Sequence, residues 1–235
     1  MHVKLKSLLG IVIFAPSLIV LSDGSAGATQ LPNNLSSAQA TVQTQIAKRI
    51  TRLGDLTNRV NVSTTISSSD RSALLGIYGN STGGDIQALN SLSIKVGSET
   101  TVAGVQADRE TLYDTYRIYA IVAPQSDLVL AADNETSVIN VMTSLEPGLS
   151  AIVKAGGSTS ATLADYNQFV SDVGAAQTAV GSISSQVLAL TPTLFNQDKS
   201  GTAALIQSDW KSIKSAQASL KEARGEINAI ILAAG

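Results

Sequence analysis

Hydrophobic residues recur in steps of three and four along most of this chain, which is the spacing of one face of an α-helix. The first such series predicts a helix that begins at Leu35 and ends near Val62. Ser67, with Asp70 three residues later, resembles a capping box, so a second helix is expected to start there. Residues 79–84 include three glycines, which are poor helix formers. The pattern therefore leaves open whether this second helix is continuous or broken.

Large side chains are concentrated between Asp108 and Asp133, so we expect this segment to form the centre of the core. Its helix opens at Thr101, and a kink is predicted at Pro124, because proline lacks a backbone donor and its ring clashes with the preceding turn. Beyond the kink the apolar stripe keeps its phase through Pro147, which indicates one bent helix that ends at Gly156-Gly157. The stripe before the kink consists of Val102, Val105, Leu112, Tyr116 and Tyr119, with Arg109 as its one polar member.

Two further helices are predicted in the C-terminal part of the chain. Thr162 with Asp165 resembles another cap, and the helix that follows keeps heptad spacing from Tyr166 to Leu190. Pro192 stops this helix, and the last helix repeats the pattern with Trp210 near its start. Because the link between them is short, the two helices are expected to form an antiparallel pair.

Together these helices predict an all-α fold: an elongated antiparallel bundle of about five long helices with coiled-coil-like packing. No segment shows the strict alternation of apolar and polar residues that a half-buried strand requires. A helix of about 30 residues is about 45 Å long, so we expect a rod rather than a sphere.

The N-terminus is typical of an export signal. Lys4 and Lys6 precede an apolar run from Leu8 to Leu21, and small residues follow up to Ala26-Gly27-Ala28. This pattern predicts a signal peptide at residues 1–28 and a mature, secreted chain at 29–235 that forms a single helical-bundle domain. A retained membrane anchor is the alternative, but the run is short for a span of about 20 residues and Pro16 interrupts it.

Composition narrows the chemistry that is available. The chain has no cysteine and one histidine, His2, which lies in the segment expected to be removed. Ser-His-Asp and Cys-His catalysis are therefore excluded from the mature chain, and zinc sites nearly so. The five acidic residues between Asp108 and Asp133 are expected to form a solvated face, because a helical rod offers no obvious cleft for glycan cleavage. We expect no enzyme activity, no catalytic residue, no cofactor and no metal.

The tyrosines and Arg117 are the candidate site residues. Tyr116 and Tyr119 continue the apolar stripe, so they are expected in the core rather than in a recognition patch. Tyr113 lies off the stripe, so it is the better candidate for an interaction patch, together with Arg117 and Asp114. The ordinary alternative for this arginine is an ion pair with Asp114 within the helix. The residues expected in the core are Leu112, Tyr116, Tyr119 and Trp210.

Several short motifs are spread over most of the mature chain. They are Tyr116-Arg117-Ile118-Tyr119, Pro124, Leu128, Ala131-Ala132-Asp133, Asp70-Arg71 and Leu190-Thr191-Pro192. In these motifs the chain resembles a group of uncharacterised secreted helical proteins of actinobacteria. The resemblance implies a secreted all-α protein and no established activity. The glycine-rich residues 79–84 depart from the pattern of that group.

Three kinds of function are compatible with these observations. The first is an exported helical bundle that acts by surface contact, in a structural, adhesion or interaction role, with an envelope or extracellular protein or glycan as its partner. The second is a helical bundle that binds a small ligand in an apolar pocket near Pro124. The third is a membrane-active protein that unpacks to insert, although no stable membrane span is expected after signal cleavage. A formal charge of −2 gives no strong field for nucleic acid, and an oligomer is compatible with the heptad faces.

Overall fold

The computed structural model describes residues 30–79, 83–155 and 159–234. All regular elements within these residues are helices, which confirms the predicted all-α class. None of the helices in this part of the chain is both long enough and apolar enough to cross a membrane. The predicted signal peptide and the predicted helix end at Gly156-Gly157 lie outside the described residues. In chain order the helices are α1 (Leu35–Val62), α2 (Ser68–Tyr78), α3 (Asp85–Ser98), α4 (Val102–Thr115), η2 (Ile118–Val122), α5 (Ala123–Ala155), α6 (Ser160–Val180), α7 (Ile183–Leu188), α8 (Pro192–Gln197) and α9 (Lys199–Ala234).

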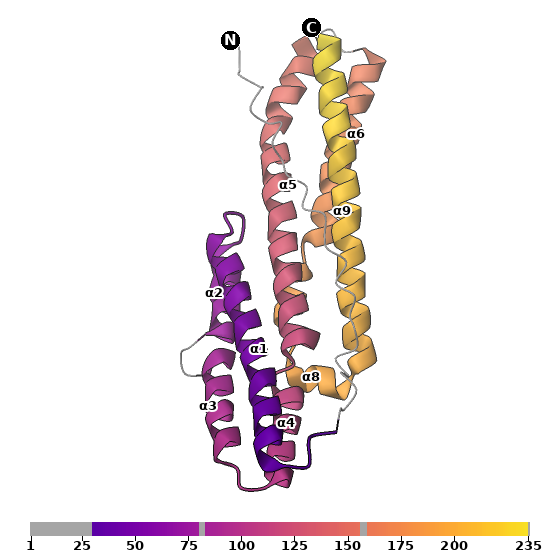
Figure 1. Ribbon diagram of the computed structural model, residues 1–235. Coiled ribbons are helices and arrows are strands. Elements are labelled where there is room, and N and C mark those ends of the chain that lie inside the picture. Colours follow the sequence, from indigo (N-terminus) through magenta and orange to yellow (C-terminus); the bar gives the residue numbers. More distant parts are fainter. Residues whose placement is uncertain (1–29, 80–82, 156–158, 235) are drawn as a thin grey trace.

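The helices are arranged in two groups within an elongated molecule (Figure 1). Helices α1 to α4 pack on one another at one end, and α5, α6 and α9 pack together along the rest of the length. The first turns of α5 also contact α1, η2 and α7. Helix α5 therefore connects the two groups and belongs to both.

Polar caps define the first helices. The Asn34 side chain accepts a hydrogen bond from the Ser37 N–H at 2.8 Å, and the Ser67 hydroxyl accepts one from the Asp70 N–H at 3.1 Å. These bonds satisfy backbone donors that have no partner inside a helix, so the predicted cap at Ser67 is confirmed. Because α2 ends at Tyr78 and α3 begins at Asp85, the glycine-rich stretch separates two helices.

The helix predicted across this region is interrupted at Tyr116 and Arg117, between α4 and the π-helical turn η2, before Pro124. Arg117 has a left-handed backbone with φ of 43°, and its carbonyl accepts N–H groups from three residues of the following π-helical turn. Pro124 lies in the first turn of α5, directly after that turn. A proline ring clashes with the carbonyl four residues earlier in a regular helix, and the wider π turn makes room for the ring. The main break of the predicted third helix is therefore at Arg117 and not at Pro124.

The C-terminal helices follow the predicted stripes with two differences. Helix α5 continues through Pro147, as its unbroken stripe predicts. The N-cap of α6 is Thr159, whose hydroxyl accepts from the Thr162 N–H at 3.2 Å, so the predicted cap at Thr162 is one turn too late. The helix predicted up to Leu190 is divided between α6 and α7 at Gly181. Its stripe stays buried across the division at Phe169, Val173, Ala176, Val180, Ile183 and Val187.

The core runs through both groups, and its largest fully buried side chains are Tyr78 and Phe169. Leu112 is fully buried, while Tyr116 and Trp210 are partly buried and pack against the core. Tyr119 was expected in the core, but it is 46 % exposed, so that expectation is wrong. The left-handed Arg117 and the π turn shift the helical phase, so Tyr119 leaves the stripe that α4 buries.

Candidate functional site

Two arginines and two tyrosines gather where α1, α4 and η2 meet, and we call Arg49, Arg109, Tyr113 and Tyr119 the arginine–tyrosine cluster. The Cζ atom of Arg49 lies 4.7 Å from the ring centroid of Tyr113 and 5.3 Å from that of Tyr119. The Cζ atom of Arg109 lies 5.6 Å from the Tyr113 centroid. Guanidinium groups within about 6 Å of an aromatic face are attracted to it by the ring quadrupole. The cluster is therefore a continuous series of cation–π contacts.

The charges of the cluster are buried and lack carboxylate partners. Arg49 is 7 % exposed and Arg109 is 5 % exposed. Arg49 donates to the Gln45 carbonyl at 3.0 Å, and the buried Nε of Arg109 has no hydrogen-bond partner among the described residues. In the same residues, no carboxylate oxygen lies within 4.0 Å of either guanidinium. The half-exposed Tyr119 ring forms the solvent-accessible edge of this cationic group.

Helical periodicity explains how the chain buries these arginines. Arg49 occupies the position between Ile46 and Leu53 on the buried face of α1, and Arg109 lies between Val105 and Leu112 on that of α4. Both are positions where an apolar residue is expected. Arg109 was visible in the sequence as a polar member of its stripe, whereas Arg49 was missed. Its signal is the seven-residue gap between Ile46 and Leu53, which a core residue should fill.

The structure separates the predicted interaction patch into two places. Tyr113 belongs to the arginine–tyrosine cluster, whereas Arg117 and Asp114 form an ion pair of 2.7 Å near α8. Arg117 also donates to Asn196 Oδ1 at 2.9 Å and its Cζ lies 5.2 Å from the Phe195 ring centroid. The Arg117 side chain, 14 % exposed, therefore holds the end of α4 against α8.

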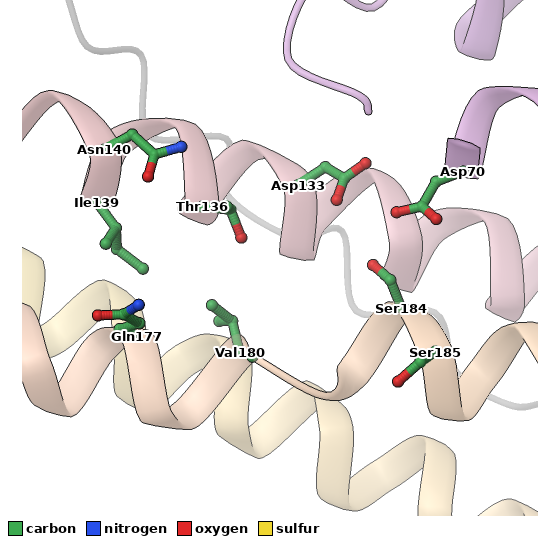
Figure 2. Close-up of a pocket in the computed structure, with 10 residues that line it drawn as sticks. Asp70, Asp133, Thr136, Ile139, Asn140, Gln177, Val180, Ser184 and Ser185 are labelled. Carbon is green, nitrogen blue, oxygen red and sulfur yellow. The ribbon is translucent and has the colours of Figure 1, made fainter. Parts of the chain in front are cut away.

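A pocket of about 360 Å³ with polar and apolar lining residues lies between α5, α6 and α7, next to the start of α2 (Figure 2). Figure 2 shows Asp70 of α2, Asp133 of α5 and Ser184 of α7 gathered at one end, with Ile139 and Val180 farther along. The Ser67 N–H donates to Asp133 Oδ2 at 2.8 Å. Burial raises the pKa of the Asp133 carboxyl, and the neighbouring Asp70 carboxylate raises this pKa further.

The first turns of α5 carry several of the polar contacts that join the two groups of helices. Asp127, 7 % exposed, pairs with Arg59 and lies 3.7 Å from the Arg52 guanidinium. The Tyr78 hydroxyl donates to Ser126, and burial raises the pKa of this tyrosine to about 12. Gln125 donates to the Val187 carbonyl at 2.6 Å. These contacts attach α1, α2 and α7 to one end of α5, which indicates a structural role for this region.

Comparison with protein-family models, curated proteins and solved structures gave no match. Across residues 30–79, 83–155 and 159–234, no group of three or more His, Cys, Asp or Glu side chains is placed to hold a metal ion.

Proposed function

We propose that this chain is an exported, non-enzymatic helical protein that acts by surface contact with a partner at or outside the cell envelope. The observation that carries the proposal is the arginine–tyrosine cluster, in which Arg49 lies against the half-exposed ring of Tyr119. Tyrosine and arginine are enriched among the residues that dominate binding energy at protein interfaces. Export follows from the signal-like N-terminus, and the resemblance to secreted actinobacterial helical proteins is part of the same proposal.

The proposal extends to how the C-terminal helices pack. Most heptad positions of α6 and α9 are buried, among them Phe169, Val173, Ile213 and Ala216. Their contacts support coiled-coil-like packing of an antiparallel pair, with α5 as a third helix alongside (Figure 1). The resulting rod presents a long outer surface for contact.

A second function is supported by the pocket shown in Figure 2. A volume of about 360 Å³ is within the range of small-ligand sites. Its carboxyl, hydroxyl and amide groups favour a small polar ligand, whereas the ligand-binding alternative drawn from the sequence placed an apolar pocket near Pro124. A membrane-active role remains the third proposal, and a liposome leakage assay with the mature chain tests it.

Capture of a partner by matched variants tests the surface-contact function. The mature chain, immobilised, is incubated with solubilised envelope and with culture medium of the producing cell. Tyr119→Ser should abolish capture of the partner because it removes the exposed ring. Leu163→Ser, at an equally exposed position of α6, 46 %, should leave capture intact. If both variants capture the partner as the parent does, the cluster does not mediate the contact.

A further inference from the structure

Among the described residues, no carboxylate forms an ion pair with Arg49 or Arg109. Asp23, in the predicted signal peptide, is the one acidic side chain that lies outside these residues. The nearby Asp108 is fully buried and pairs with Lys95 of α3. The two arginines therefore place an uncompensated positive charge under the Tyr113 ring.

Such an arrangement is costly for the isolated protein. An unpaired charge in a poorly solvated position loses hydration without gaining a counterion, and two like charges beside one ring repel each other. The cation–π contacts offset part of this cost. The buried Nε of Arg109 has no hydrogen-bond acceptor among the described residues, which adds to this cost. An anion supplied from outside would compensate this positive charge.

From this geometry we infer that the arginine–tyrosine cluster is an anion-binding site that accepts a carboxylate side chain from an acidic segment of a protein partner. The inference rests on the proposed function and specifies its partner. Arginine donates through a planar fork that matches a carboxylate in two parallel hydrogen bonds. The exposed ring of Tyr119 would cover an apolar neighbour of that carboxylate on the partner.

The charge of the whole protein does not explain this site. The chain has a formal charge of −2, so nonspecific attraction to acidic partners is not expected from its overall field. Affinity for an acidic segment would have to come from a local cationic group. The arginine–tyrosine cluster is such a group, and it combines the two residue types, Arg and Tyr, that are enriched at the centres of protein interfaces.

Titration with a fluorescein-labelled oligo-glutamate peptide tests the inference directly. The mature protein should bind the peptide, and the affinity should fall as salt is added. Arg49→Gln and Arg109→Gln should each weaken binding by about tenfold or more, since each removes a charged hydrogen-bond donor. Lys214→Gln, which removes the same charge from an exposed position of α9, should change the affinity by less than about twofold.

A second variant separates loss of the site from loss of the fold. Arg109→Met keeps a long apolar side chain and removes the uncompensated charge, so without peptide it should melt at or above the temperature of the parent. The peptide should raise the melting temperature of the parent and leave that of Arg109→Met unchanged. If the variant melts lower and still binds the peptide like the parent, the arginine is a structural residue and the inference is wrong.

Parallel titrations identify the source of the anion. Inorganic phosphate and phosphatidylglycerol vesicles serve as the other probes. Arginine-dependent binding to vesicles without binding to the peptide would overturn the choice of a protein partner. If Tyr119-dependent capture of a partner persists while the peptide does not bind, the inference fails and the proposed function stands. If the peptide binds and no partner is captured, the proposed function fails.

Discussion

Two tyrosines, Tyr78 and Tyr119, occupy very different environments, and substituting each of them tests the fold. Tyr78 is fully buried and its hydroxyl donates to Ser126, whereas Tyr119 is 46 % exposed. Tyr78→Ala should lower the free energy of unfolding by about 3 to 5 kcal/mol, because it leaves a cavity in the core. Tyr119→Ala should cost less than about 1 kcal/mol. Thermal melts of both variants measure this, and equal losses would contradict the placement of the two rings.

The buried carboxylate of Asp127 is the basis of a second prediction about a single residue. Asp127→Asn should lower the free energy of unfolding by about 1 to 3 kcal/mol, because Arg59 and Arg52 lose their charged partner. Asp55→Asn, at an exposed position of α1, should stay within about 0.5 kcal/mol. Urea denaturation measures the free energy of unfolding of both variants. If Asp127→Asn has the same stability as the parent, the ion pairs do not stabilise the fold.

Sequence reasoning at the residue scale succeeded where one helix determines the environment. Leu112 follows the stripe of α4 and is fully buried. Tyr119 continues the same three-and-four spacing, but the left-handed backbone of Arg117 changes the helical phase between Leu112 and Tyr119. The sequence gives no sign of this conformation, because non-glycine residues rarely adopt it. Arg49 was missed because a buried arginine depends on partners from α4 and η2, which are distant in sequence.

At the scale of elements, the pattern predicts helices better than it predicts their interruptions. Helix α1 agrees with its predicted span, and α5 continues through Pro147. The division between α6 and α7 was not predicted, because the buried stripe keeps its spacing across Gly181. Hydrophobic periodicity indicates which residues are buried. A short turn that keeps the same face buried does not change that periodicity, so the pattern does not reveal the turn.

The contact of α2 with α5 and α7 should make stability depend on pH. The pKa of Asp133 is raised, first by burial and then by the Asp70 carboxylate, so the native state holds a proton on Asp133 more tightly than the unfolded chain does. That contribution to stability is present at low pH and is lost as the pH rises through the raised pKa. Asp133→Asn removes the ionisation and should therefore raise the melting temperature, relative to the parent, more at about pH 8 than at about pH 4, close to the ordinary pKa of an aspartate.

Melting curves of the parent, Asp133→Asn and Asp55→Asn at both pH values measure this effect. The exposed Asp55→Asn control should show no such trend. If the melting temperatures of Asp133→Asn and the parent differ by the same amount at both pH values, the raised pKa of Asp133 does not affect stability and this prediction is wrong.

At the scale of the whole molecule, the sequence correctly anticipated a helical and elongated protein, because long apolar stripes require long helices. It did not anticipate two groups of helices that share α5 (Figure 1). That arrangement depends on contacts such as Gln125 with the Val187 carbonyl and Asp133 with the Ser67 N–H. Each joins residues of different helices, and no local spacing reports such pairs.

Export of the molecule is a prediction that N-terminal sequencing checks. The product recovered from the medium of the producing cell should begin at or near Thr29, because the small residues before it form the expected cleavage site. Recovery of the chain from the membrane with its first residue intact would contradict export and favour the anchored alternative.

The central claim is that a partner of the exported protein contacts the arginine–tyrosine cluster, and photo-cross-linking on the producing cell tests it most directly. A photo-reactive phenylalanine derivative replaces Tyr119 in one variant and the equally exposed Leu163 in another. After illumination, the variant at 119 should form one discrete covalent adduct with a protein partner, and Arg109→Met in the same chain should abolish it. Equal adducts from both positions, or none from position 119, would contradict the claim.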